Sequence, residues 1–350
     1  MLAMKINGQN GGPFVSHRNI MNSSLKKKYN FIPLWIPRAR VLLNPIAMFK
    51  LVKSIKKVNP EFVQIAGLQL DGFLTMIVCK FAGVKTVLAI HGSVQESMQI
   101  FGIKRWIIKN MERYTVKHST FCYGVSDYVS SWEICKLSMN YFGTIYNISQ
   151  LEDSNDNIRQ RLKLMKNDII IVSTGRVEKE KGYDILLEII KKLKNQNNIK
   201  FVISGEGTYR SELQAEIKRL GYEDRVFLLG YQKNITSVLN GADIFVICTK
   251  HETLCISLLE AAMSKLPLVA TNVGGIPEII EDSVNGYLVN NFDIDIFCEK
   301  IINLSKNSNL RKQMGKNAFR TINKKFNDNT ILKKLDSLYQ SVLKYNSIKY

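Results

Sequence analysis

Metal-binding and disulfide patterns are missing from this chain of 350 residues. Its six cysteines contain no C-x-x-C pair and several lie in apolar runs, which is typical of reduced, buried thiols in a cytosolic protein rather than of disulfides or a zinc site. The four histidines show no metal-ligand spacing. We therefore expect neither a bound metal nor another cofactor.

Long apolar runs are also scarce. The stretch from Met1 to Phe14 is polar and glycine-rich, without the apolar core of a signal peptide. The most apolar early segment, from Phe62 to Gly83, is interrupted by Gln64, Gln69, Asp71 and Lys80 and falls short of roughly 18 uninterrupted apolar residues. We expect a cytoplasmic protein without a transmembrane helix, whose membrane contact would be peripheral, on the inner face of the cell membrane.

Acidic residues are few in the first part of the chain. The whole chain carries a net charge of +19, and residues 1–150 hold 19 Lys and Arg against six Asp and Glu. Such a basic region needs an anionic partner or a large solvated surface. Nucleic acid, an anionic membrane and phosphorylated small molecules are the candidate partners; a proteome generally rich in lysine would explain the charge without any partner.

Short β-branched runs alternate with helical patterns in the C-terminal half, which is the signature of a doubly wound α/β domain with a buried parallel sheet. We predict strands at 169–174, 201–204, 226–229, 243–248 and 268–271, and helices at 184–194, 209–220, 235–239 and 255–264.

The N-terminal half has a weaker pattern of the same kind. It predicts strands at 62–65, 86–90 and 120–125 and helices at 47–57, 72–81 and 104–117, while the first strand, near residues 4–7, is poorly marked. We expect an N-terminal domain over 1–150, a polar boundary within 148–168, a C-terminal domain over 168–325 and a terminal helical segment over 326–350.

The loop after the first C-terminal strand contains two cations. Arg176 and Lys181 lie five residues apart in Gly175-Arg-Val-Glu-Lys-Glu-Lys-Gly182, just before a predicted helix. A guanidinium fork, an ammonium group and free helix N–H groups together suit a diphosphate. A solvated charged loop is the alternative, because Glu178 and Glu180 are interleaved with the cations.

Two glutamates flank the start of a later helix, in the run from Lys250 to Met263. Glu252 follows a strand, and Glu260 lies within an otherwise apolar helix, where an isolated carboxylate is costly to bury. A carboxylate accepts two hydrogen bonds and suits a sugar hydroxyl, and the N–H groups of Cys255, Ile256, Ser257 and Leu258 could hold a phosphate. Ser257 and Ser264, the neighbours of Glu260, make that helix face small and polar, so that it can accept a sugar hydroxyl. Alternatively, Glu252 caps the helix and Glu260 is a carboxylate at the edge of the core with a local partner.

Glycines mark two more strand-to-helix turns. Gly205-Glu206-Gly207 lacks the third glycine of a dinucleotide fingerprint, and no phosphate-binding P-loop pattern occurs in the chain. Gly274-Gly275 allows either a close backbone approach or an ordinary turn. His91 ends a strand beside a glycine, a position that fits a ligand-binding edge or a structural histidine equally well.

Taken together, these blocks resemble family 4 of the retaining glycosyltransferases. The resemblance rests on Gly175–Gly182, on Gly205–Gly207 and on the run from His251 to Val289, in which Glu252 and Glu260 have the spacing of that family's E-x7-E motif. It implies the GT-B fold: two Rossmann-like, doubly wound parallel-sheet domains facing a central cleft, with the C-terminal helix returning to the N-terminal domain.

The resemblance also implies roles for individual residues. Arg176, Lys181, Gly12 and the helix start at Ile256, Ser257 and Leu258 would bind the donor's diphosphate, and Glu260 the ribose. Glu252, with Thr253, Leu254 and Cys255, would contact the transferred sugar, and His91 would face the reacting centre. The family usually has glycine after the first glutamate, where this chain has Thr253.

The implied reaction moves a hexose-type sugar from a nucleotide diphosphate sugar, by family frequency a UDP-sugar, to a saccharide or polyprenyl diphosphate-linked acceptor with retention of configuration. Protein cations would replace a metal at the diphosphate. A bacterial surface polysaccharide is the expected product, and the N-terminal cations would meet an anionic membrane; they are Lys26, Lys27, Lys28, Arg38, Arg40, Lys50, Lys53, Lys56, Lys57, Lys104, Arg105 and Lys109.

Two rival functions remain at this point. A sugar-nucleotide epimerase of the same fold would need acid and base groups that the sequence does not identify. A basic nucleic-acid-binding protein would suit the charge, although no recognisable nucleic-acid module is present and we expect no nucleic-acid partner.

Overall fold

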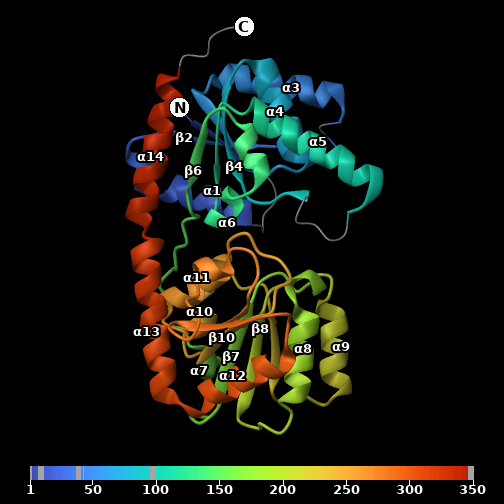
Figure 1. Cartoon of the computed structure of the whole chain (residues 1–350), viewed down its shortest axis with the longest axis vertical. Helices are drawn as coiled ribbons and strands as arrows, with labels where there is room; N and C mark the ends of the chain where they lie inside the picture. The colour runs from blue at the N-terminus through green and yellow to red at the C-terminus, as the bar shows by residue number, and fades with distance from the viewer. Residues whose placement is uncertain (1, 7–11, 37–40, 42, 95–99, 346–350) are drawn as a thin grey trace. The chain divides into compact units, whose positions relative to one another are not determined.

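The computed structural model describes residues 2–6, 12–36, 41, 43–94 and 100–345 (Figure 1). The chain divides into two compact units. Unit 1 comprises Met1–Ile148 together with Asp328–Tyr350, and unit 2 comprises Ser149–Asn327. Each unit has its own sheet and its own core, so each is described separately.

Unit 1 is built on a parallel sheet whose described strands have the order β2-β1-β3-β4-β5-β6. The strands are β1 (Leu2–Ile6), β2 (Phe31–Trp35), β3 (Phe62–Ala66), β4 (Lys85–Ile90), β5 (Phe121–Gly124) and β6 (Tyr141–Thr144). Central β3 is buried at every position, as expected for a strand covered on both faces.

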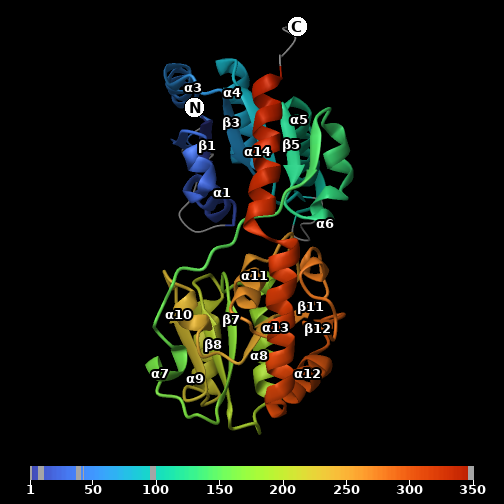
Figure 2. The ribbon, with the colours of Figure 1, turned by 90° about the vertical axis from the view of Figure 1, so that its left-hand side faces the viewer.

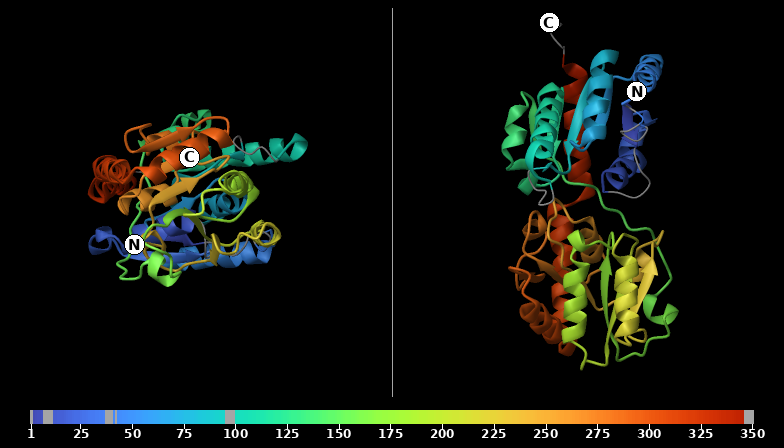
Figure 3. Two further views of the ribbon diagram at one scale, coloured as in Figure 1. Left: turned by 90° about the horizontal axis from the view of Figure 1, so that it is seen from below. Right: turned by 90° about the vertical axis from the view of Figure 1, so that its right-hand side faces the viewer.

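Helices cover both faces of this sheet. They are α1 (Gly12–Asn22), α3 (Pro45–Val58), α4 (Leu70–Ala82), α5 (Gly102–His118), the short α6 (Asp127–Ser130) and α14 (Asp328–Lys344). Figures 1 and 2 and the right panel of Figure 3 place α3, α4 and α5 on one face, with α1 and α14 on the other. The last helix of the chain is thus part of the first unit.

A chain of buried polar groups fixes α14 to the unit 1 sheet. The Tyr339 hydroxyl donates to Gln64 Oε1 at 2.6 Å, and Gln64 Nε2 donates to the Tyr123 hydroxyl at 3.1 Å. Nearer the surface, Asp336 accepts from Lys28 and Tyr29. Because Tyr339 and Gln64 are fully buried, each needs the other as a hydrogen-bond partner.

Unit 2 has a parallel sheet with the order β12-β11-β10-β7-β8-β9 among the described strands. These are β7 (Ile169–Thr174), β8 (Ile199–Ser204), β9 (Val226–Gly230), β10 (Ile244–Ile247), β11 (Leu268–Thr271) and β12 (Gly286–Val289). Continuous runs such as IIIVST in β7 are buried throughout, because helices cover both faces.

The unit 2 helices are α7 (Ile158–Arg161), α8 (Tyr183–Lys192), α9 (Arg210–Arg219), α10 (Thr236–Leu239), α11 (Ile256–Met263), α12 (Ile294–Lys306) and α13 (Ser308–Lys325). Helices α8, α9 and α12 line one face of the sheet, and α10, α11 and α13 the other (Figures 2 and 3). The first layer covers an apolar core centred on β7, β8 and α8.

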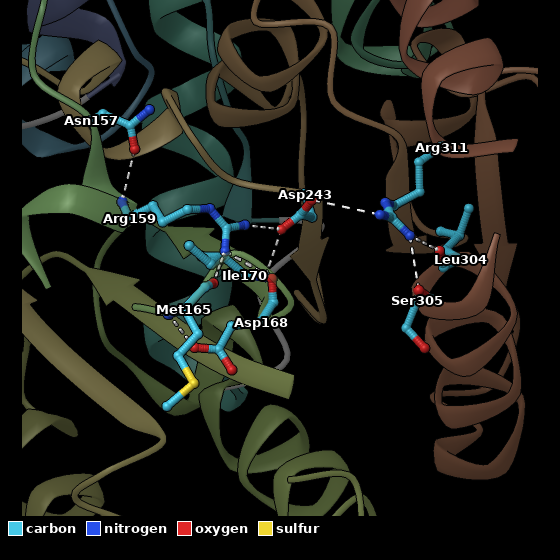
Figure 4. A network of polar contacts seen from close by, with 9 residues as sticks. All are labelled: Asn157, Arg159, Met165, Asp168, Ile170, Asp243, Leu304, Ser305 and Arg311. Carbon is cyan, nitrogen blue, oxygen red and sulfur yellow. Dashed lines mark hydrogen bonds and ion pairs between the residues drawn. The ribbon is translucent and has the colours of Figure 1, made fainter. Parts of the chain in front are cut away.

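Asp243, just before β10, ties together several segments of unit 2 (Figure 4). Its Oδ2 accepts from Arg159 at 2.7 Å and from the N–H of Ile170 at 2.9 Å, and its Oδ1 lies 3.7 Å from a nitrogen of Arg311. The carboxylate therefore joins α7, β7 and α13 at the end of the sheet where β7 and β10 begin. The carboxyl ends of the same strands are left for other contacts.

The sequence prediction of two doubly wound parallel-sheet domains is confirmed, and the predicted helices and strands agree with the structure to within a few residues. The helices α1, α6 and α7 and the strands β2, β6 and β12 were not predicted. Within the described residues, no helix is long and apolar enough to cross a membrane.

Candidate functional site

The strand order of unit 2 puts a natural binding edge between β7 and β10. The chain begins this sheet at β7, builds outward to β8 and β9, and then returns to place β10 on the other side of β7. Loops on opposite sides of such a switch point leave in opposite directions at the carboxyl ends of the strands, which opens a crevice for ligands. The segments 175–182 and 248–255 follow these two strands.

Backbone-to-backbone packing holds the loops of this edge in place. A Cβ on Gly205 would lie 1.7 Å from the carbonyl oxygen of Gly175, and one on Gly182 would lie 1.8 Å from that of Cys248. A Cβ on Gly274, which has φ of +55°, would lie 1.8 Å from the carbonyl oxygen of Glu252. The Gly274-Gly275 turn is therefore a close backbone approach that supports the Glu252 loop.

Lys181 and Glu252 meet across the switch point. The Lys181 ammonium donates to Glu252 Oε1 at 2.6 Å, and the two side chains are only 20% and 14% exposed. Arg176 lies in the same loop as Lys181, with 57% of its side chain exposed and a longer contact of 3.3 Å to Glu178. The edge thus combines one sheltered ion pair with one guanidinium that is open to solvent.

A second ion pair was not foreseen from the sequence. Lys250, two residues before Glu252, donates through its ammonium to Asp184 Oδ2 in the first turn of α8 at 2.6 Å, and its N–H donates to the carbonyl of Glu180. Both contacts tie the loop after β10 to the segment after β7. The sequence signal at Asp184 was only that of an acidic residue in the first turn of a helix, which is common and does not indicate an ion pair with a distant lysine.

The first turn of α11 offers backbone donors at the same edge. Cys255 occupies the N-cap position without a side-chain cap. The N–H of Leu258 already donates to the Cys255 carbonyl at 3.2 Å, whereas those of Ile256 and Ser257 donate to no other described residue. An uncapped helix start with two such N–H groups favours an anion.

Glu260 has no local partner among the described residues. Its carboxylate makes no hydrogen bond or ion pair with another described residue, the Ser257 hydroxyl contacts the Cys255 thiol at 3.2 Å, and the Ser264 hydroxyl has no partner. Burial raises the pKa of Glu260 to about 7. A ligand that donates to this carboxylate would relieve the cost of its burial.

The side chains of Leu254, Cys255 and Leu258 are buried in the unit 2 core. These residues can therefore contribute only backbone atoms to a ligand. Thr253 is partly exposed, and its carbonyl oxygen would lie 2.2 Å from a Cβ on Gly275. Gly275 thus leaves room for a close approach of the Thr253 backbone.

His91 and Gly12 belong to unit 1. His91 directly follows β4, and α1 begins at the exposed Gly12 and carries the buried His17. Burial, and secondarily the charge of His17, lower the pKa of His91 to about 3. Its imidazole is therefore neutral near pH 7 and can exchange hydrogen bonds but cannot supply a positive charge. Gly11 lies outside the described residues.

A buried carboxylate holds the loop that follows His91. Glu112 on α5 is fully buried, and it accepts from the Ser93 hydroxyl and from the N–H of Val94, each at 2.7 Å. Burial raises its pKa. Sequence reasoning did not single out Glu112; the available signal was an acid on the same helix face as the buried Thr115 and Val116.

One Asp-x-Asp tripeptide, Asp293-Ile294-Asp295, occurs in the sequence. This spacing can suit a divalent cation, but here the tripeptide lies at the start of α12. Asp293 caps α12 by accepting from the N–H groups of Asp295 and Ile296, and Asp295 forms an ion pair with Lys192. In the part of the chain that the structure describes, no three His, Cys, Asp or Glu side chains are grouped so as to hold a metal ion.

Of the N-terminal cations, Arg38 and Arg40 lie outside the described residues, and Lys28 is paired with Asp336. The lysines of α3 are exposed, as are Lys104 and Lys109 of α5. Neither the first turn of α3 nor that of α5 contains an acidic residue.

Residues 154–321 match the family model described as group 1 glycosyl transferases. Two curated bacterial relatives match most of the chain. Poly(ribitol-phosphate) alpha-N-acetylglucosaminyltransferase of Staphylococcus aureus is 28% identical over 95% of this chain and 66% of its own length. UDP-Gal:alpha-D-GlcNAc-diphosphoundecaprenol alpha-1,3-galactosyltransferase of Escherichia coli is 24% identical over 88% of this chain and 81% of its own length.

Among solved structures, Anabaena HepE in complex with UDP and glucose superposes with a TM-score of 0.79. It covers 97% of this chain and 99% of its own, at 18% identity. At that identity the likeness establishes the two-domain fold.

Proposed function

We propose that this glycosyltransferase, whose residues 154–321 match the group 1 glycosyl transferases, transfers a hexose-type sugar from a UDP-sugar to a saccharide or polyprenyl diphosphate-linked acceptor of a bacterial surface glycan. The edge between β7 and β10 carries this proposal. There, cations, two glutamates and an uncapped helix start gather on one sheet edge.

The donor's diphosphate would bind to the cations of the loop after β7. Arg176 presents an exposed guanidinium fork, and Lys181 is held in place by Glu252 at 2.6 Å. The N–H groups of Ile256 and Ser257 would add neutral hydrogen-bond donors. The backbone of Gly12, at the start of α1 in unit 1, would add another. Such groups stabilise the negative charge that grows on the diphosphate as its bond to the sugar breaks.

Glu260 would bind the ribose. A ribose presents two neighbouring hydroxyls, and the carboxylate has acceptor capacity that no other described residue uses. Because its pKa lies near 7 without ligand, two hydroxyl donors would also stabilise its ionised form.

We further propose that the reaction retains the configuration of the sugar. The acceptor oxygen would attack the anomeric carbon on the face that the diphosphate leaves, and the acceptor's proton would pass to the departing phosphate oxygen. Glu252, Thr253, Leu254 and Cys255 would position the sugar, while neutral His91 would hydrogen-bond to it. The names of both relatives specify an alpha product; a donor with an α-linked diphosphate gives that product only with retention.

Cations of the protein would take the place of a metal ion at the diphosphate. Lys181 and Arg176 supply two positive charges where a metal-dependent enzyme has a divalent cation. Activity should therefore persist in a chelator, and a loss that added magnesium restores would contradict this part of the proposal.

The acceptor side would lie in unit 1, at a membrane. The Escherichia coli relative's name specifies an undecaprenol-linked diphosphate acceptor. A chain that uses such an acceptor would work at the cytoplasmic membrane face, where the lysines of α3 and α5 would meet anionic lipid, each contributing about 1 kcal/mol near the surface. The transferases among its relatives give no support to an epimerase or a nucleic-acid-binding protein.

The decisive test is calorimetric binding of UDP, GDP and ADP to the wild-type chain, with Glu260→Ala and Arg176→Ala as variants. We expect micromolar binding of UDP that both variants weaken by about tenfold or more. Lys218→Ala removes a charge from α9 and serves as the matched control. If folded wild-type protein binds none of the three nucleotides, the donor-site assignment is wrong.

A further inference from the structure

The first two turns of α5 leave large apolar side chains in solvent. Ile103 is 79% exposed, Trp106 67% and Ile107 46%, and Phe101, immediately before the helix, is 72% exposed. Residues at i, i+3 and i+4 share one helix face, so Ile103, Trp106 and Ile107 form a continuous outward stripe. Contiguous exposed apolar surface of this kind marks an interaction site.

Cations flank this stripe. At 3.6 residues per turn, Lys104 and Lys109 lie on either side of it, and both are exposed. Between Gly102 and Met111 the helix has no acidic residue. An apolar face bordered by basic side chains is the pattern of helices that lie in the plane of an anionic membrane interface.

A second helix, on the same face of the unit 1 sheet, repeats the pattern. At the start of α3, Ile46 is 66% exposed and Phe49 70%, and they are followed by exposed Lys50 and Lys53. Helices α3 and α5 both pack on α4, which lies between them. Figure 1 shows them on the same side of unit 1.

From these observations we propose that α5, supported by α3, is an interfacial anchor that inserts the stripe Ile103-Trp106-Ile107 into an anionic lipid surface. This deepens the proposed function, on which it rests for the location of the acceptor, and it goes beyond attraction by basic residues. A second copy of the chain fits this face less well, because two copies face to face would bring their cations together.

The opposite face of α5 connects this anchor to the site. Glu112 lies about half a helical turn around from the stripe and holds Ser93 and Val94, the loop that follows His91. The second half of α5 also packs on α4. One helix therefore joins the lipid-facing stripe to the acceptor-side loop, so docking would place that loop at the membrane surface.

The test is co-sedimentation of the full chain with vesicles of phosphatidylcholine alone, or of phosphatidylcholine mixed with phosphatidylglycerol. We expect binding to the mixed vesicles. Ile103→Ser with Trp106→Ser should weaken it by about tenfold or more, because the apolar area that leaves water is lost. Phe81→Ser, which removes a 70% exposed aromatic ring from the end of α4, should change binding less than about twofold.

Two further variants separate insertion from adsorption. Trp106→Phe should still bind, but it should lose most of the quenching of tryptophan fluorescence by brominated lipid. Lys104→Gln with Lys109→Gln should weaken binding more than Lys312→Gln with Lys316→Gln, an exposed lysine pair on α13.

Binding that high salt abolishes and the serine variant leaves unchanged would overturn the proposal in favour of purely electrostatic adsorption. A lipid-independent dimer that the serine variant dissociates would assign the stripe to a second copy and equally overturn it. UDP binding, measured alongside, keeps the two proposals apart: retained UDP binding without vesicle binding rejects only the anchor, and the reverse result rejects only the donor site.

Discussion

Units 1 and 2 are built on the same kind of sheet but handle charge in opposite ways. At the binding edge of unit 2, two cations are paired across loops, Lys181 with Glu252 and Lys250 with Asp184, each at 2.6 Å. In unit 1 the cations at the starts of α3 and α5 have no acidic residue in the same helical turn and alternate with exposed apolar side chains.

The difference indicates two kinds of ligand. Paired charges on loops locked by glycine contacts form a fixed site, which suits a small, rigid, doubly charged group. Exposed lysines among exposed apolar residues suit an extended surface that supplies its own negative charge. The same fold thus supports a small-molecule site in one unit and a broad surface in the other, and four changes would test this contrast.

The largest effect is expected at Lys181. Lys181→Ala should lower kcat by about a hundredfold or more, because it removes a preorganised cation and leaves Glu252 buried without its partner. Lys179→Ala is the matched control, since Lys179 lies in the same loop and pairs with Glu212 on the surface. If both variants lose activity equally in a steady-state assay, unit 2 does not depend on the sheltered pair.

Gly274→Ala should come next. The new Cβ would meet the Glu252 carbonyl at 1.8 Å at a φ of +55°, so we expect a loss of about 3 kcal/mol in the free energy of unfolding, with weaker UDP binding. Gly83→Ala in unit 1 has a similar φ of +73° but nothing within 4 Å, and should cost only about 1 kcal/mol. If the two variants lose equal free energies of unfolding in chemical denaturation, backbone strain at positive φ, and not the collision with the Glu252 carbonyl, determines the destabilisation.

Tyr339→Phe tests unit 1 alone. It leaves Gln64 Oε1 buried without its donor and should lower the free energy of unfolding by about 1–3 kcal/mol. UDP affinity should not change, because no residue of the donor site is touched. Tyr345→Phe, beyond the end of α14, should be nearly neutral in denaturant titrations; a fall in UDP affinity of the Tyr339 variant would show that the units are not independent.

The smallest effect concerns pH. Glu260 has a pKa of about 7, above its usual 4.5, so protonated Glu260 is favoured in the folded protein and its contribution to stability falls as pH rises from 4.5 to about 7. Hydroxyl groups donate hydrogen bonds more strongly to the ionised carboxylate than to the protonated one. UDP affinity should therefore rise by up to about tenfold as the pH rises over this range. Calorimetry of Glu260→Gln should retain only the slope that UDP's own phosphate produces.

The strands that the sequence did not predict share a position. Strands β2, β6 and β12 all lie at sheet edges, where one side has no neighbour and a strand needs neither length nor continuous apolar residues. Pro33 in β2 is tolerated for the same reason. Buried strands such as β7 were predictable because both faces demand apolar side chains.

The same limit applies to the site. Sequence reasoning identified Arg176, Lys181, Glu252 and Glu260 as candidates from their places after strands and within a helix. Which of these side chains contact one another depends on the order of strands in the sheet. Local hydrophobic periodicity does not predict that order. The pairs Lys181–Glu252 and Lys250–Asp184 span 71 and 66 residues, so only the folded sheet reveals them.

The return of α14 to unit 1 has a consequence for the order of folding. Unit 2 is one continuous stretch, Ser149–Asn327, whereas unit 1 is closed by Asp328–Lys344 at the far end of the chain. During synthesis, unit 2 can therefore be complete while the part of the unit 1 sheet that packs against Tyr339 is still uncovered. Unit 1 is synthesised first but completed last. Until α14 docks, the Gln64 amide and the apolar side chains that α14 covers stay exposed in the nascent chain, and a chaperone would have to protect them.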